Sequence, residues 1–248
     1  MTVLVSPFRL ARRSAIISGQ HSEAESLALN ADRFAMIVDP AEAATEYAAL
    51  ALYDRAGGTL LHARGATLPS LTTLGGRPVV QGNDNGGHLR AAWQLPQSYF
   101  MAAAFRTGTD FATTNAIISS ATQNDNRLLF GTIGTSLVIL HGPNFPLAST
   151  TPMATNTDYV AWASFDADTM AAEIGVNAVT PHAVGTLPVL HKGDPETSFF
   201  GGIGGWGFDA KFAPAVVVPR FLGGAIYAAR RAAILAWLGE TVGVGIGA

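Results

Sequence analysis

The chain has 248 residues and a formal net charge of −3; 13% of its residues are charged, 27 are glycine and none is cysteine. This composition excludes a disordered acidic or basic protein, a coiled coil, a disulfide scaffold, a cysteine-ligated zinc site and a cysteine nucleophile. The length allows one large domain or two small ones with a sizeable hydrophobic core.

Residues 1–45 differ in pattern from the rest of the chain and are predicted to form an N-terminal arm or anchoring segment. Its basic cluster comprises Arg9, Arg12 and Arg13. We expect this cluster to be solvated or paired at an interface; contact with a nucleic acid or an acidic partner is the alternative. The three arginines also interrupt the apolar stretch that a secretory signal would need, so no signal peptide is expected.

Two short helical segments are expected in the second half of this arm. Residues 22–29 are typical of a helical turn. Asp39 followed by Pro40 indicates a helix start with Asp39 as the N-cap, although a turn followed by extended chain is the alternative. No apolar run approaches the length of a transmembrane helix, so no membrane insertion is expected.

From residue 46 onward, short apolar segments alternate with turn signals, which predicts an all-β sandwich over residues 46–248. Residues 99–105 are apolar on both alternating faces, as a central strand would be. The period of two in residues 170–176 places Glu173 on the face opposite Ile174. The main expected strands are 47–53, 99–105, 128–130, 137–140, 159–165, 170–176, 215–218 and 224–227.

The pattern changes to a helical period near the end of the chain. A helix is predicted over residues 229–238, because Ile234, Trp237 and Leu238 lie at helical spacing and form an apolar stripe. Gly239 is expected to close this helix, and Trp237 to anchor it to the sandwich.

Several segments, in this order, resemble concanavalin A-like (laminin G-like) jelly-roll domains, especially those of bacteriophage and bacterial surface proteins. The matching segments are 75–82 with 87–89, 99–106, 160–166 with 174–177, and 199–202 with 223–227 and the C-terminal helix. Ala178 replaces the glycine that is usual in the family's central turn. The resemblance covers roughly residues 60–240 and implies a jelly-roll sandwich. This fold hosts lectins, glycosidases and structural modules, so it does not decide the function.

The resemblance and the low charge together favour a non-enzymatic virion surface protein of a tailed phage or phage-like particle, serving as a capsid decoration, fibre or adsorption module. Such a protein would be a homo-oligomer on the virion surface, made in the host cytoplasm and bound to other virion proteins. The alternative is a carbohydrate-binding, lectin-like module that recognises host surface glycans. The weak net charge favours neither nucleic acid nor an anionic membrane as a partner.

The carboxylates argue against catalysis. A retaining glycosidase needs two carboxylates about 5 Å apart. The chain has seven glutamates, at positions 23, 25, 42, 46, 173, 196 and 240. Glu173 is the one on an expected core strand, and it has no carboxylate two or four residues later. No G-x-S-x-G sequence is present, so we expect no enzymatic activity.

The candidate ligand-binding residues come from two glycine-rich segments. Trp206 lies in the glycine-rich stretch 201–208, where an exposed indole could bind a sugar, although filling a sheet edge or a subunit contact is the alternative. Residues 81–88 are rich in oxygen ligands, but tight turns explain this composition better than calcium. We expect no metal and no cofactor. The candidate ligand-binding residues are Trp206, Phe208, Asn83, Asp84 and Asn85.

Overall fold

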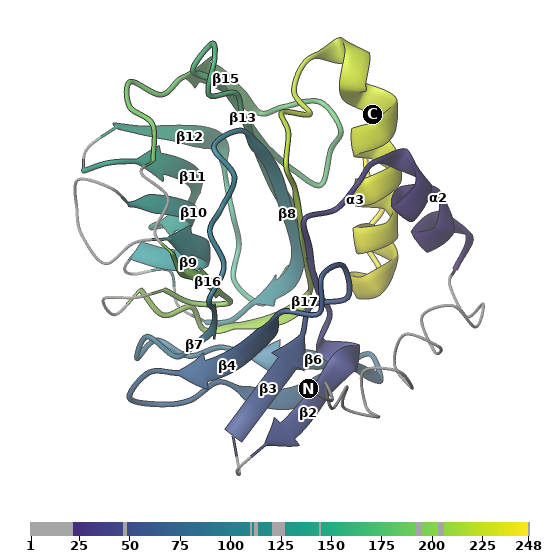
Figure 1. Ribbon diagram of the computed structural model, residues 1–248, viewed down its shortest axis with the longest axis vertical. Coiled ribbons are helices and arrows are strands. Elements are labelled where there is room, and N and C mark those ends of the chain that lie inside the picture. Colours follow the sequence, from purple (N-terminus) through teal and green to yellow (C-terminus); the bar gives the residue numbers. More distant parts are fainter. Residues whose placement is uncertain are drawn as a thin grey trace, which may run out of the picture.

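The computed structural model describes residues 22–46, 49–109, 111, 114–120, 127–143, 145–191, 195–202 and 206–247. These residues form two antiparallel β-sheets packed face to face, with two α-helices on the far side of one sheet (Figure 1). The predicted all-β sandwich with a C-terminal helix is therefore confirmed.

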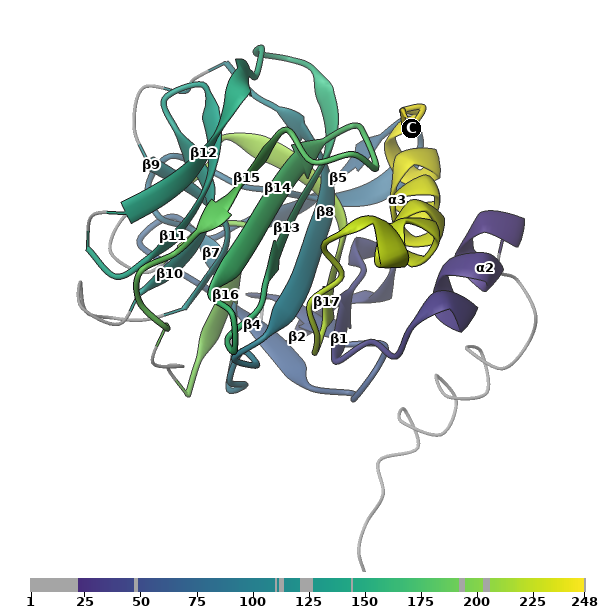
Figure 2. The same cartoon turned by 90° about the horizontal axis from the view of Figure 1, so that it is seen from above.

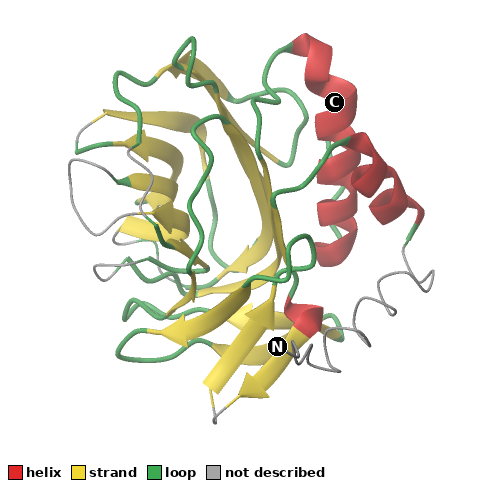
Figure 3. Cartoon of the chain, in the orientation of Figure 1, coloured by secondary structure: helices red, strands yellow, loops and turns green. Residues whose placement is uncertain are grey.

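The described strands form an eight-stranded sheet and a nine-stranded sheet (Figure 3). The eight-stranded sheet has the order β15-β14-β13-β8-β17-β6-β5, and β1 also pairs with β17. Its strands are β1 (Met36–Val38), β5 (Ser70–Leu74), β6 (Arg77–Gln81), β8 (Tyr99–Thr107), β13 (Asp158–Phe165), β14 (Ala171–Val176), β15 (Ala183–Thr186) and β17 (Ala210–Val218).

The nine-stranded sheet has the order β12-β11-β10-β9-β16-β7-β4-β3-β2. Its strands are β2 (Ala43–Glu46), β3 (Ala49–Tyr53), β4 (Leu60–Arg64), β7 (His88–Ala91), β9 (Thr114–Ser120), β10 (Leu128–Ile133), β11 (Ser136–His141), β12 (Phe145–Pro152) and β16 (Thr197–Phe199). The helical elements are α2 (Glu23–Ala31), η1 (Pro40–Glu42), η2 (Ala225–Tyr227) and α3 (Ala228–Val242).

The eight-stranded sheet is the middle layer of three, so both of its faces are covered. On β8, Met101 and Phe105 belong to the hydrophobic core between the two sheets. Phe100 and Ala102 alternate with them and belong to a second core between the sheet and the helices. Figure 2 shows α3 lying against this second face and α2 lying against the outer side of α3. This arrangement explains the strand's two apolar faces.

The C-terminal helix is longer than predicted. It extends to Val242, where Gly243 in the left-handed conformation caps it, and does not end at Gly239. Trp237 is 1% exposed and packs in the second core, as expected. The strand predicted at 224–227 is wrong, because this segment forms the 3-10 turn η2 that leads into α3.

The predicted boundary at residue 45 does not separate an arm from the sandwich. It falls within β2, and β1 pairs with β17 in the eight-stranded sheet. Asp39 caps η1 by accepting a hydrogen bond from the Ala41 amide, and Arg55 on the sandwich forms ion pairs with both Asp39 and Glu25. Residues 22–45 are thus part of the domain. Arg9, Arg12 and Arg13 lie outside the described residues, and the anchoring role of residues 1–45 stays a prediction.

Glu173 occupies the helix-facing side of β14, opposite the core residue Ile174, as the alternation predicts. Its Oε1 accepts a hydrogen bond of 2.8 Å from the Gly224 amide. Its Oε2 lies 3.9 Å from Nη1 of Arg231, which is 2% exposed. This carboxylate therefore helps to join α3 to the sheet.

Candidate functional site

Trp206 lies on the outer face of the nine-stranded sheet, the face directed away from the core. The strand register places Leu129 opposite Leu140, and Val138 opposite Gly131, on this face. Leu129, Val138 and Leu140 form a small apolar cluster against which Trp206 packs while keeping part of its surface exposed. Of the two described α-helices, α3 packs on the other sheet and α2 packs on α3 (Figure 2). The indole is thus an accessible aromatic group on a face that these helices leave open.

The guanidinium group of Arg127 lies over the indole ring of Trp206. Its guanidinium carbon lies 5.3 Å from the centroid of the Trp206 ring, a cation–π contact. The guanidinium is fixed by donating hydrogen bonds to the carbonyl oxygens of Gly142, at 2.9 Å, and Pro143, at 2.6 Å. A ligand at this point therefore meets an apolar ring edge beside a cation. Sequence reasoning missed Arg127, because only the fold brings it to Trp206.

The loop that contains Asn83, Asp84 and Asn85 is held in shape by its own side chains. Oδ1 of Asn83 accepts hydrogen bonds from the amides of Asn85, at 3.0 Å, and Gly87, at 3.2 Å. Its Nδ2 donates to the carbonyl oxygen of Thr67. These bonds are typical of an Asx turn. Asp84 and Asn85 are exposed.

The fold brings this loop next to Trp206, although the two segments are far apart in the sequence. Oδ1 of Asp84 accepts a hydrogen bond of 3.2 Å from the Asp209 amide. Gly207 packs directly on the loop backbone, since a Cβ at this position would overlap the carbonyl oxygen of Asn83. Trp206 and the predicted loop residues are therefore neighbours on one rim of the sandwich.

Phe208 is not an exposed ligand-binding residue, so this part of the prediction is wrong. Its side chain is fully buried in the core between the two sheets. Its ring centroid lies 5.7 Å from those of Phe105 and Phe212, and 5.9 Å from that of Phe111. The chain turns inward after Trp206, and a large apolar side chain at 208 gains more from burial than from exposure.

The close fit of Gly207 can be tested by stability. We expect Gly207→Ala to destabilise the domain by about 1–3 kcal/mol, because the added methyl group must push apart two packed backbone segments. Gly245→Ala is the matched control, since a Cβ there meets open space. Urea denaturation measures both variants, and equal stabilities would contradict the tight contact.

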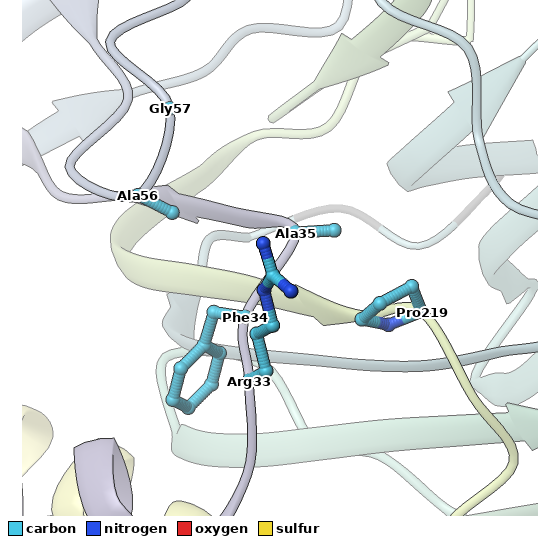
Figure 4. A pocket seen from close by; sticks show the side chains of 6 residues that line it. All are labelled: Arg33, Phe34, Ala35, Ala56, Gly57 and Pro219. Carbon is cyan, nitrogen blue, oxygen red and sulfur yellow. The ribbon is translucent and has the colours of Figure 1, made fainter.

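A shallow pocket of about 420 Å³ lies on the helix side of the molecule (Figure 4). It occupies the junction of the segment before β1, the end of β17 and the turn after β3. In Figure 4 the side chain of Arg33 extends between Phe34 and Pro219. Sequence reasoning gave no signal for this pocket, because each lining residue is ordinary on its own. The lining residues are Arg33, Phe34, Ala35, Ala56, Gly57 and Pro219.

A buried polar network joins the two sheets inside the core. The hydroxyl of Tyr99 on β8 lies 2.6 Å from Nε2 of His141 on β11, and Nδ1 of His141 lies 3.1 Å from the carbonyl oxygen of Val189. His191 packs on both rings and its Nε2 lies 3.1 Å from the Pro96 carbonyl oxygen. Burial and the neighbouring His191 lower the pKa of His141 to about 3. Both histidines are fully buried, so this network serves the fold.

Within the described ranges, no three histidine, aspartate or glutamate side chains gather closely enough to hold a metal ion. In the same part of the chain, neither α-helix has the length and apolar character needed to cross a membrane.

This chain resembles known proteins in its structure and not in its sequence. No protein-family model matches the chain, and no curated protein matches it in sequence. Domain 4 of AbnA, a GH43 extracellular arabinanase from Geobacillus stearothermophilus, is 10% identical with a TM-score of 0.59, and the match covers 72% of this chain and 91% of that one. A structure of botulinum neurotoxin type C is 11% identical with a TM-score of 0.58, covering 84% of this chain and 53% of the toxin chain. Trypanosoma rangeli sialidase is 9% identical with a TM-score of 0.62, covering 99% of this chain and 40% of the sialidase.

These likenesses define the class of the fold, a jelly-roll-like β-sandwich. The chain is comparable in extent to the whole arabinanase domain but spans about half or less of the toxin and sialidase chains. The expected link to phage proteins and to laminin G-like domains is not among these findings.

Proposed function

We propose that this protein is a carbohydrate-binding β-sandwich module and that Trp206 contacts the sugar. The observation that carries the proposal is the partly exposed indole on the outer face of the nine-stranded sheet, beside Arg127. Sugar sites combine an aromatic surface with polar groups that fix orientation, and the guanidinium of Arg127 and the exposed loop residues Asp84 and Asn85 are such groups near Trp206.

The similar structures support this proposal by analogy of fold. The arabinanase domain was solved in complex with arabinotriose, and cell entry of botulinum neurotoxin type C depends on interaction with two ganglioside molecules. One fold hosts many functions, so the argument from the site at Trp206 remains the primary one.

The proposal is for binding without catalysis. Glu173 supports it, because this carboxylate is buried beneath α3 and is engaged by Gly224 and Arg231. It therefore cannot act on a substrate at the surface.

The experiment that tests the proposal is a glycan array followed by calorimetric titration of the full chain. We expect Trp206→Ala to weaken sugar binding at least about tenfold, because a central aromatic contact contributes about 1.4 kcal/mol or more. Phe34→Ala is the control, since Phe34 is also partly buried but lies in the pocket on the helix side. Loss of binding in Phe34→Ala alone would move the site to that pocket.

The virion surface role remains the second candidate, with homo-oligomerisation and other virion proteins as its predicted consequences. It rests on the resemblance in sequence, and the solved structures named above include no phage protein. Light scattering on the full chain and on residues 22–248 tests it, because the shorter chain keeps α2 and β1. A monodisperse monomer in both samples would count against this role.

A further inference from the structure

The outer face of the nine-stranded sheet is basic where β4 and β7 lie side by side. The strand register places His62 opposite Arg90 and Arg64 opposite His88. Side chains on one face of neighbouring strands lie close together, so these four residues form one patch, here called the basic patch. The residues that alternate with them point into the core; they are Leu61, Ala63, Leu89 and Ala91.

The basic patch borders Trp206. A Cβ built on Gly201 would lie 3.0 Å from Cβ of His88, and a Cβ built on the next residue, Gly202, would lie 3.2 Å from Cβ of Trp206. Two consecutive glycines thus separate Cβ of Trp206 from Cβ of His88. A single oligosaccharide can therefore contact both the indole and the basic patch.

The basic patch carries uncompensated positive charge. Glu196 forms an ion pair with Arg90. Arg64 is exposed, and it forms no ion pair with any residue that the structure describes. An exposed arginine without a carboxylate partner can bind an anionic group with little loss of existing interactions.

His88 adds a buried hydrogen-bond acceptor. Its Nδ1 lies 2.8 Å from the carbonyl oxygen of Gly86, so this nitrogen carries the proton and Nε2 carries the lone pair. The side chain is 7% exposed, and Nε2 has no hydrogen-bond partner among the described residues. Burial and the charges of Arg90 and Arg64 lower the pKa of His88, which keeps the ring neutral. Because Nε2 is itself buried, a ligand at the surface meets Arg64 and not this nitrogen.

We propose that the ligand of the Trp206 face is an anionic oligosaccharide, with a carboxylate or sulfate group on Arg64. This inference rests on the proposed carbohydrate-binding function and specifies its ligand class. A nucleic acid fits less well, because tight binding needs several phosphate contacts and the chain carries a net charge of −3.

The test uses the full chain with matched probes by isothermal titration. An oligogalacturonide is compared with its methyl ester, and dextran sulfate with dextran, so that the two arms distinguish carboxylate from sulfate. We expect one acidic probe to bind about tenfold more tightly than its neutral partner, and this preference to fall as salt rises. Arg64→Ala should remove the preference but keep the weaker neutral binding, whereas Trp206→Ala should weaken binding of both members of the pair.

Arg77→Ala is the control, because Arg77 lies on β6 of the other sheet; it should leave every affinity unchanged. Equal affinity for acidic and neutral probes would overturn this inference and leave the proposed function standing. Failure of every glycan to bind would overturn both. Equal binding of single-stranded DNA that survives Trp206→Ala would also overturn the inference, since it would show a non-specific attraction for polyanions.

Discussion

Lowering the pH from about 7 to about 4 is expected to reduce the free energy of unfolding steeply, because His141 is buried in its neutral form. Its pKa is lowered to about 3 by burial and by the adjacent His191, whereas an unfolded histidine titrates near about 6.5. Below pH 6.5 the unfolded chain binds a proton that the folded chain excludes, so stability falls as the pH falls.

The size of this effect follows from the difference between the two pKa values. His141 alone contributes a slope of up to about 1.4 kcal/mol per pH unit between about pH 6.5 and 3, or about 5 kcal/mol in total as an upper limit. Burial lowers the pKa of His191 as well, which adds to the fall in the same direction. Above about pH 6.5 His141 is neutral in both the folded and the unfolded chain, so its contribution to the free energy of unfolding no longer changes with pH.

Urea denaturation at several pH values measures the slope. His141→Gln should make it shallower, because the amide does not titrate. Tyr99→Phe is the matched variant, since it removes the hydroxyl bonded to Nε2 but leaves His141 buried. It should lower stability by about 1–3 kcal/mol and keep the steep pH dependence. Identical slopes in wild type and His141→Gln would contradict the burial of a neutral His141.

Replacing Arg231 with alanine is expected to cost about 3–5 kcal/mol, because it removes the cation that compensates a buried carboxylate. Arg231 is a residue of α3, and its side chain lies between this helix and the eight-stranded sheet. Its Nε donates a hydrogen bond of 2.8 Å to the carbonyl oxygen of Val179, and its Nη1 donates to the carbonyl oxygen of Leu222. Its guanidinium carbon is 4.8 Å from the ring centroid of Trp162. The variant leaves Glu173 without its cation and opens a cavity beneath the helix.

Arg230 provides the control on the same helix. Its side chain is 45% exposed, and its Nη1 lies 3.4 Å from a carboxylate oxygen of Asp32. The Asp32 side chain is 3% exposed, but it also pairs with Nε of Arg220 at 3.3 Å. Arg230→Ala therefore leaves this carboxylate a partner and should cost no more than about 1 kcal/mol by thermal and urea denaturation. Adding Glu173→Gln to Arg231→Ala should recover part of the loss. A cost below about 1 kcal/mol for Arg231→Ala would show that the buried ion pair does not hold α3 in place.

Local patterns in the sequence predicted the strands with strong apolar alternation. Residues 99–105, 159–165 and 170–176 all lie in or closely overlap observed strands. The position of Glu173 on the face opposite Ile174 is also confirmed, because side-chain alternation is a property of the strand alone. The strand predicted at 224–227 failed, since the demands of the following helix outweighed a short apolar run.

The sequence likewise predicted some residues of the candidate site and missed others. Composition and the glycine-rich context singled out Trp206 and the loop at Asn83, and the fold places them side by side. The same reasoning placed Phe208 at the surface, although it lies in the core. Arg127 and the patch around Arg64 could not be predicted, because their proximity to Trp206 depends on strand pairing between distant segments.

The sequence by itself determined the fold class and the presence of the terminal helix, because both depend on residue type and short-range periodicity. The tertiary structure decided how two glycine-rich segments meet, why β8 is apolar on both faces, and that residues 22–45 belong to the sandwich. The physical reason is that these features depend on strand order and on which face the helices cover. The low charge is thus consistent with a sheet that is buried on both faces. The abundant glycine allows backbone segments to pack closely beside Trp206.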